Sequence, residues 1–207
     1  MKALRAIRNV SWALIAMTIV VVGTTLLDWR ILDRHEHARD IVPQSAMSVG
    51  GPFTMVDHTG RTVTEKDFLG LPFVVFFGFT HCPDICPTTL SWLSDLVEGA
   101  APEGRRPTVM FVTVDPERDT TEVLGNYIGS FGPGIVGLTG SLDQVTEMAK
   151  TWKVYFKKVP LESGGYTMDH SASIFLMGRD GKFRGTLDLH DTTRDGNLRK
   201  LTALVKE

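Results

Sequence analysis

The sequence predicts an α/β protein in which helices flank a mixed β-sheet, preceded by one N-terminal transmembrane helix. Two nearly unbroken apolar runs, Phe73–Phe79 and Thr108–Val114, are rich in β-branched and aromatic residues, as strands buried on both faces are. Segments with helical periodicity alternate with such runs, and a hairpin signal at Arg179–Lys182 closes the series. An apolar run near the N-terminus stands apart from these elements and predicts the membrane helix.

The bulk properties are those of an ordinary globular protein. A length of 207 residues suggests one domain plus an appendage. The formal net charge of -2 and the pI near 6.3 give no electrostatic reason to expect a nucleic-acid partner.

Residues 10–27 predict an uncleaved membrane anchor. At about 1.5 Å per residue this apolar run would measure roughly 27 Å, enough to cross the hydrocarbon core of a bilayer. A cleaved signal peptide is the alternative, but the run exceeds the usual ~7–15 residues of a signal core, and no small-x-small cleavage site follows it. Trp12 and Trp29 flank the run, as interfacial anchors do.

The distribution of charge predicts the orientation of this anchor. Three cations and no acid lie in residues 1–9, whereas residues 28–49 mix arginines with acids. We therefore expect a cytoplasmic tail (1–9), a single-pass anchor in the inner, cytoplasmic membrane (10–27), a linker (28–49) and a periplasmic domain (50–207). The periplasm is oxidising, so two cysteines there could form a disulfide.

The first half of the domain predicts two short strands, one buried strand and a helix. Phe53–Asp57 alternates like a strand, Asp57–Gly60 is a hairpin turn, and a second short strand starts at Val63. A helical turn at 65–69 ends at Gly70, and the buried strand Phe73–Phe79 follows. Pro87 suits the first turn of the next helix, which places leucines on one face and ends at Gly99.

The second half continues the alternation of strands and helices. The buried strand Thr108–Val114 ends at Asp115-Pro116, and Ser141 is the predicted N-cap of a helix that extends to about Trp152. The remaining predicted elements are a helix at 121–128, strands at 135–139, 153–159, 173–177 and 183–187, and a last helix at 193–205.

Cys82 and Cys86, the only cysteines of the chain, follow the first buried strand and precede a helix. A helix N-terminus lowers the pKa of a thiol, and side chains four residues apart on a helix face the same point. The pair could close a disulfide, hold a soft metal ion, or alternate between the two. An inert structural disulfide is the alternative, although so short a loop gives little stability.

A third group for this site has to come from elsewhere in the sequence. Ligands bind beyond the carboxyl ends of strands in open α/β sheets, where Cys82 and Cys86 lie. His170 falls in an expected loop between two strands, and its residue context leaves both a ligand role and a structural role open. Two thiolates and one imidazole suit Cu(I), or Cu(II) with a further ligand, whereas structural zinc normally takes four protein ligands.

The neighbouring polar residues are expected to be structural. His81 adjoins Cys82, and adjacent side chains rarely point the same way, so we expect it beside the site and not in it. Asp115 and Asp119 are interpreted as turn and capping residues. Arg118 is expected to pair with a local acid.

Four motifs in order resemble the Sco/SenC proteins. They are Gly78–Pro87 with the apolar strand before it, Val114–Thr120, Val136–Gly140 and Asp169–Ser171. The resemblance covers the chain from about Gly50 to the C-terminus, and the predicted membrane anchor agrees with it.

The resemblance implies a thioredoxin-like fold and a copper site, Cu(I) or Cu(II), formed by Cys82, Cys86 and His170. It implies a metallochaperone for cytochrome c oxidase assembly, which delivers copper to the dinuclear copper site of subunit II or reduces the cysteines of that site. Cys82 and Cys86 would then be a redox-active pair with a possible disulfide. The implied partners are subunit II and a copper-donor protein or thiol reductant.

Two other functions remain open from the sequence. A periplasmic thiol–disulfide oxidoreductase would use the same pair, although the spacing is C-x-x-x-C and not the C-x-x-C common in such enzymes. A peroxide-reducing enzyme would need a cation beside its reactive thiolate, and no arginine adjoins either cysteine in sequence.

Overall fold

The computed structural model describes residues 17–18, 22–24, 49–101, 105–188 and 193–207. The chain divides into two compact units, Met1–Met47 and Ser48–Glu207. The predicted tail (1–9), most of the predicted anchor (10–27) and nearly all of the predicted linker (28–49) lie outside the described residues. Within the described residues, no helix has both the length and the apolar character needed to cross a membrane.

In the described part of the second unit, seven strands form one mixed sheet in the order β2-β1-β5-β4-β3-β8-β9. The three central strands, β3, β4 and β5, run parallel, and the outer strands pair antiparallel. The strands are β1 (Thr54–Asp57), β2 (Thr62–Thr64), β3 (Phe73–Gly78), β4 (Thr108–Thr113), β5 (Ile135–Thr139), β8 (Ile174–Met177) and β9 (Phe183–Leu187). The mixed sheet predicted from the sequence is confirmed.

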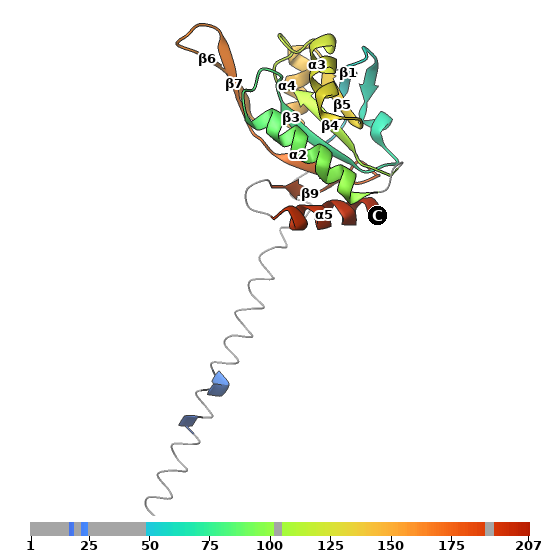
Figure 1. Cartoon of the computed structure of the whole chain (residues 1–207), viewed down its shortest axis with the longest axis vertical. Coiled ribbons are helices and arrows are strands. Elements are labelled where there is room, and N and C mark those ends of the chain that lie inside the picture. The colour runs from blue at the N-terminus through green and yellow to red at the C-terminus, as the bar shows by residue number, and fades with distance from the viewer. Residues whose placement is uncertain (1–16, 19–21, 25–48, 102–104, 189–192) are drawn as a thin grey trace, which may run out of the picture. The chain divides into compact units, whose positions relative to one another are not determined.

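Helices pack on both faces of this sheet. They are α2 (Ile85–Ala100), α3 (Thr121–Ile128), α4 (Leu142–Thr151) and α5 (Arg194–Lys206), with short 3₁₀ turns η1 (Glu65–Phe68) and η2 (Gly129–Phe131). Successive residues of a strand point to opposite faces. Accordingly Phe76 contacts Phe111, which in turn contacts Tyr127 of α3, whereas Phe77 contacts Trp152 after α4. Figure 1 shows α2 lying across the sheet, and α5 packs beside it.

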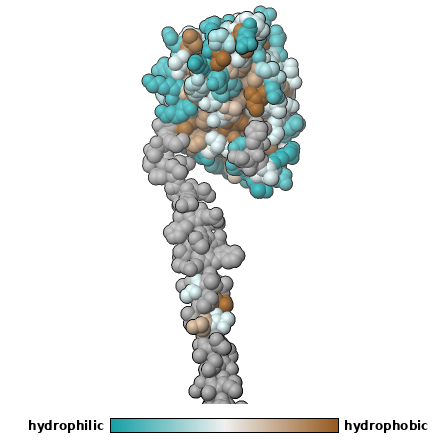
Figure 2. Space-filling model, turned by 90° about the vertical axis from the view of Figure 1, so that its left-hand side faces the viewer, coloured by the Kyte–Doolittle hydropathy of each residue, from teal (hydrophilic) through white to brown (hydrophobic). Residues whose placement is uncertain are grey.

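The core explains why the apolar runs form central strands. All six residues of β3 and five of the six residues of β4 are buried. On the face drawn in Figure 2, apolar groups lie among hydrophilic ones. The large apolar side chains exposed in the described part of the chain are Met17, Val22, Leu69, Leu71, Val123, Leu142, Tyr155 and Leu161.

Most predicted helix limits agree with the structure to within a residue or two. Ser141 caps α4 by accepting a hydrogen bond from the Gln144 N–H, as predicted. Helix α2 passes through Gly99, the predicted end, because a glycine can continue a helix at a modest cost in stability.

The sequence did not predict the second sheet of the domain. Strands β6 (Phe156–Pro160) and β7 (Tyr166–His170) form an antiparallel hairpin that extends from the domain in Figure 1. The sequence placed His170 in a loop, whereas it is the last residue of β7 and pairs with Phe156. The prediction was wrong because β7 forms by pairing with β6, and its own sequence alternates only weakly.

Candidate metal centre

The two cysteines occupy the connection from the central strand β3 to helix α2. Cys82 lies in the loop, where its N–H donates to the carbonyl oxygen of Phe79 at 3.3 Å. Cys86 is the second residue of α2, so the pair meets at the start of the helix and does not share one helical turn. Both thiols are free.

A hydrogen bond from main chain to side chain connects the pair. The Cys86 N–H donates to the Cys82 sulfur at 3.4 Å. The N–H groups of the first helical turn have no partner within the helix, so this sulfur satisfies one of them. The bond holds the Cys82 sulfur close to the N-terminus of α2.

The two thiols differ in their exposure to solvent. Cys86 is fully buried, whereas Cys82 is partly exposed. Burial raises the pKa of the Cys86 thiol far above its usual value, and the negative charges of Cys82 and Asp119 raise it further. The prediction that the helix N-terminus lowers the pKa of the thiol is therefore wrong for Cys86. Desolvation disfavours the charged form of this thiol more strongly than the helix N-terminus favours it.

Gly78 creates the space for the Cys86 sulfur. A Cβ atom at this position would lie 2.9 Å from that sulfur and 2.6 Å from the ring of Phe111. The last residue of β3 must therefore lack a side chain if the first turn of α2 is to pack against the sheet.

His170 meets Cys86 although 84 positions separate the two residues. Its Nε2 lies 3.7 Å from the Cys86 sulfur. Its Nδ1 lies 3.0 Å from the carbonyl oxygen of Ser171, so the proton of the neutral ring sits on Nδ1 and the Nε2 lone pair faces the thiol. The ring stands edge-on to Phe79, with centroids 5.8 Å apart.

The electrostatics of His170 favour the form that binds metals. Burial lowers the pKa of the imidazole, and this effect outweighs the opposite effects of the Ser171 carbonyl and the Asp169 charge. A neutral imidazole with a free Nε2 is the form that ligates a metal ion.

The fold therefore brings together all three site residues that the sequence singled out. The Cys82 sulfur touches the Cys86 main chain, and the Cys86 sulfur touches His170. Among the described residues, no group of three His, Cys, Asp or Glu side chains is already arranged to hold a metal ion. The three side chains are thus neighbours in the structure.

Asp119 has a different role from the predicted cap. Thr120 is the residue that caps α3, through a bond from the Val123 N–H. Asp119 is fully buried and accepts bonds from the Thr80 N–H at 3.0 Å, the Thr80 hydroxyl at 2.6 Å and the Thr113 hydroxyl at 2.6 Å. The carboxylate thus anchors the segment that leads into Cys82.

The other two predictions about neighbouring residues agree with the structure. His81 is about half exposed, and its Nδ1 lies 3.0 Å from the Thr80 hydroxyl and 3.8 Å from Asp119, so the ring is engaged beside the site. Arg118 pairs with Asp115, as expected of a local ion pair.

Tyr127 is a neighbour of the site that the sequence did not reveal. Its hydroxyl is buried and has no hydrogen-bond partner among the described residues. Burial raises the pKa of this phenol, and the charges of Cys86, Cys82 and Asp119 raise it further, so the hydroxyl lies in the electric field of the cysteine pair. Nothing in the helical pattern of α3 distinguishes this tyrosine from a core residue.

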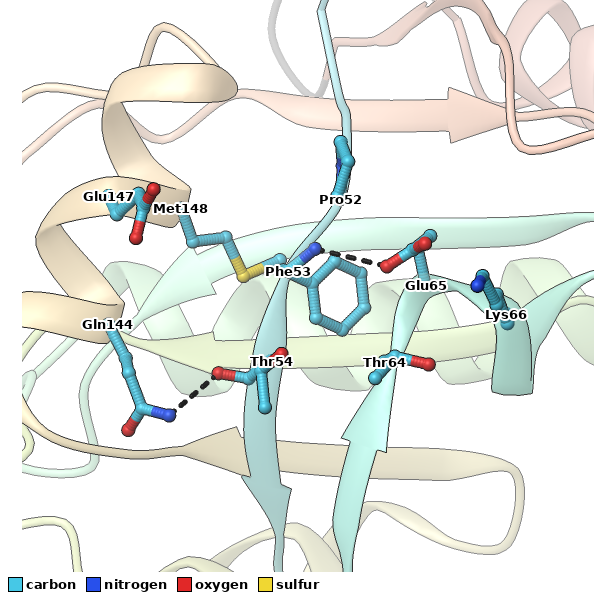
Figure 3. A pocket seen from close by; sticks show the side chains of 9 residues that line it. All are labelled: Pro52, Phe53, Thr54, Thr64, Glu65, Lys66, Gln144, Glu147 and Met148. Atoms are coloured by element: carbon cyan, nitrogen blue, oxygen red, sulfur yellow. Dashed lines mark hydrogen bonds between the residues drawn. The ribbon is translucent and has the colours of Figure 1, made fainter.

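A pocket of about 390 Å³ lies elsewhere, between β1, η1 and α4 (Figure 3). Two of its polar side chains already bond to the main chain: Glu65 accepts from the Phe53 N–H, and Gln144 donates to the Thr54 carbonyl. None of the predicted site residues lines it.

Comparisons with known proteins identify relatives of this chain. The SCO1/SenC family model matches residues 42–206. The human mitochondrial SCO1 homologue is 36% identical over 182 residues, which cover 84% of this chain and 60% of the relative. The human mitochondrial SCO2 homologue is 43% identical over 136 residues, covering 64% of this chain and 51% of the relative. The chain thus spans about half to two thirds of the length of these curated relatives.

Solved structures of similar proteins include copper complexes. Bradyrhizobium japonicum ScoI with copper bound is 40% identical, with a TM-score of 0.70 over 76% of this chain and 99% of that one. Yeast Sco1 with copper bound is 36% identical, with a TM-score of 0.71 over 77% of this chain and 90% of that one. With the family match over most of its length, and with the fold and the Cys–Cys–His cluster described above, this chain belongs to the SCO1/SenC family.

Proposed function

We propose that this protein binds one copper ion through Cys82, Cys86 and His170 and serves in the assembly of cytochrome c oxidase. It would deliver copper to the dinuclear copper site of subunit II, or reduce the cysteines of that site. The observation that carries the proposal is the 3.7 Å contact between the Cys86 sulfur and His170 Nε2, in a fold whose relatives include copper-bound proteins.

The donor set supports copper over other ions. Thiolate and imidazole are soft or intermediate ligands, and three of them suit the low coordination number of Cu(I). Calcium and magnesium prefer oxygen ligands, and structural zinc prefers four protein ligands. A buried thiol with a raised pKa gives up its proton when a cation binds beside it, so copper binding would release protons.

The proposed location follows from the sequence. Residues 10–27 would anchor the protein in the inner membrane, with the domain from residue 50 in the periplasm. A fusion of alkaline phosphatase to the C-terminus should be active, since this enzyme needs an oxidising compartment to form its disulfides. An inactive but expressed fusion would contradict this topology.

Copper titration of the reduced full-length protein in detergent tests the ligand set. We expect one Cu(I) per chain, and we expect Cu(II) to give a sulfur-to-copper absorption band. His170→Ala should abolish stable Cu(II) binding, whereas His81→Ala, the matched control beside Cys82, should bind as the wild type does. An unchanged Cu(II) spectrum and affinity in His170→Ala would refute the ligand set.

Thiol–disulfide exchange by the same pair is the second candidate, favoured by the unequal burial of the cysteines. The partly exposed Cys82 thiolate would attack one sulfur of a disulfide in the recipient, release the other sulfur as a thiolate and form a mixed disulfide. The Cys86 thiolate would then attack Cys82, which releases the reduced recipient and leaves a Cys82–Cys86 disulfide. A thiol reductant would have to restore the pair.

Trapping separates this candidate from copper delivery. If exchange occurs, Cys86→Ser should accumulate a mixed disulfide through Cys82 with a peptide whose two cysteines are joined in a disulfide, and Cys82→Ser should not. Equal absence of adducts in both variants would leave copper delivery as the function of the site.

A further inference from the structure

The β6–β7 hairpin that carries His170 is not part of the main sheet. Among the described strands, β6 and β7 pair only with each other. At its base, the Ser171 N–H donates to the Tyr155 carbonyl, and the Tyr155 N–H donates to the Ser171 hydroxyl, so these bonds also stay within the hairpin region. The position of His170 relative to Cys86 is therefore set by the short connection to β8, which begins at Ile174, and by contacts between the hairpin and the domain.

Tyr166, the first residue of β7, makes several of these contacts. Its hydroxyl donates to Asp115 Oδ1 at 2.9 Å, and its carbonyl oxygen accepts a bond from Arg118 Nη1 at 3.0 Å. The Arg118 guanidinium carbon also lies 3.8 Å from the centre of the Tyr166 ring, at cation–π distance. Arg118 thus contacts both the main chain and the ring of Tyr166.

Asp115 completes this arrangement from the end of β4. The residue is 2% exposed, and its second carboxylate oxygen accepts a hydrogen bond from Arg118 Nε. Its carbonyl oxygen also accepts bonds from the N–H groups of Arg118 and Asp119, which fold residues 115–119 into a tight turn. Charge-assisted hydrogen bonds such as that between Arg118 and the buried Asp115 fix the relative geometry of the groups that they join.

The same turn also holds the cysteine loop. Asp119, at its end, bonds to the main chain and the hydroxyl of Thr80, two residues before Cys82. Residues 115–119 therefore connect the segment that carries the cysteines with the hairpin that carries the histidine.

We propose that Asp115, Arg118 and Tyr166 form a clamp that positions His170 against Cys86 for metal binding. These are positioning residues, because they act on copper through the hairpin and do not touch it. The proposal rests on the proposed function, since it assumes that His170 is a ligand.

If the clamp positions His170, its loss should affect the binding of Cu(II) more than the binding of Cu(I). Two thiolates alone suffice for a Cu(I) ion, which accepts low coordination numbers, whereas Cu(II) requires the imidazole and a further donor. Loss of the clamp should therefore weaken Cu(II) binding and leave Cu(I) affinity nearly unchanged. Removing a group that orients a metal ligand typically costs 10–100-fold in affinity, and we expect about tenfold for Arg118→Ala.

A double-mutant cycle in the full-length protein in detergent tests the clamp. Cu(II) dissociation constants are measured by chelator competition for wild type, Arg118→Ala, His170→Ala and the double variant, with thermal unfolding of each metal-free protein. Arg184→Ala is the matched control: Arg184 is as buried as Arg118 and forms ion pairs with Asp180 and Glu207, but lies on β9. We expect the Arg118 change to weaken Cu(II) binding in the wild type and to have no further effect once His170 is removed.

The outcomes distinguish failure of the clamp from failure of the proposed copper ligands. If His170→Ala binds Cu(II) normally, the ligand set is wrong, and the clamp proposal fails with it. If His170→Ala loses Cu(II) but Arg118→Ala does not, or if the two effects add independently, only the clamp is overturned. Tyr166→Phe keeps the ring and removes one hydroxyl, so it tests the same selectivity if Arg118→Ala does not fold. Cu(II) affinity of Tyr166→Phe equal to that of the wild type would then refute the clamp.

Discussion

Replacing Gly78 with alanine should destabilise the domain and disturb the cysteine site together. The new methyl group would lie 2.6 Å from the ring of Phe111 and 2.9 Å from the Cys86 sulfur, closer than packed side chains approach one another. Phe111 has little freedom to give way, because its ring lies between Phe76 and Tyr127 with centroids 5.9 and 5.6 Å away. The cost is therefore steric and not conformational, since Gly78 does not adopt a positive φ.

The magnitude follows from what overpacking costs in a core. An extra methyl group in a closely packed interior typically costs about 1–3 kcal/mol. With a urea m value of about 2 kcal/mol/M, a loss of ~2 kcal/mol would lower the unfolding midpoint by about 1 M. Urea unfolding of the metal-free, reduced protein, followed by tryptophan fluorescence, measures this shift directly.

Gly129 provides the matched control for this substitution. An alanine Cβ there would meet no heavy atom within 4 Å in the described part of the chain, and the residue has a helical φ of -57°. Gly129→Ala should therefore be neutral or stabilise the protein by up to about 1 kcal/mol. Equal urea midpoints for Gly78→Ala and wild type would refute the argument that Gly78 makes room for Cys86.

Three further predictions concern single side chains. Tyr127→Phe removes a buried hydroxyl that has no hydrogen-bond partner among the described residues. In urea unfolding, this change should leave the free energy of unfolding unchanged or raise it by about 1 kcal/mol. A loss of more than about 1 kcal/mol would show that the hydroxyl does have a partner. Asp119→Asn should lower thermal stability by about 1–3 kcal/mol, because one of two acceptor oxygens becomes a donor facing the donors of Thr80 and Thr113; an unchanged unfolding temperature would contradict this anchoring role. Asp57 should stabilise the protein in a pH-dependent way. Burial alone would raise the pKa of its carboxyl, but hydrogen bonds from Thr59 and Arg61 outweigh this effect of burial and hold the pKa below the ordinary 3.8. Its contribution is therefore fully present above about pH 4 and is lost as the pH falls through the lower folded-state pKa, so the stability difference between wild type and Asp57→Asn should shrink at acid pH and should not grow.

The sheet and its helices were predictable because their signals are local. The apolar runs of β3 and β4 are long enough to exclude exposed strands, and Ser141 with Gln144 forms a capping box that the sequence displays directly. The position of Cys82 and Cys86 at a strand end followed from the same elements.

The remaining features depend on contacts between distant segments. Strand β7 exists because it pairs with β6, and Cys86 is buried because α2 packs on β3 over Gly78. The contact of Arg118 with Tyr166 spans 48 positions, and that of Cys86 with His170 spans 84. Because no local pattern indicates such contacts, the sequence alone predicts a loop at His170 and a lowered pKa for Cys86.

The two cysteines are unequally buried, so they are not equally accessible from solvent. A reagent, metal ion or donor atom arriving from solvent reaches the partly exposed Cys82 before the fully buried Cys86. By the same route, a group leaving the pair for another molecule would pass Cys82 last. The exposed sulfur would thus serve both as the point of entry and as the point of exit.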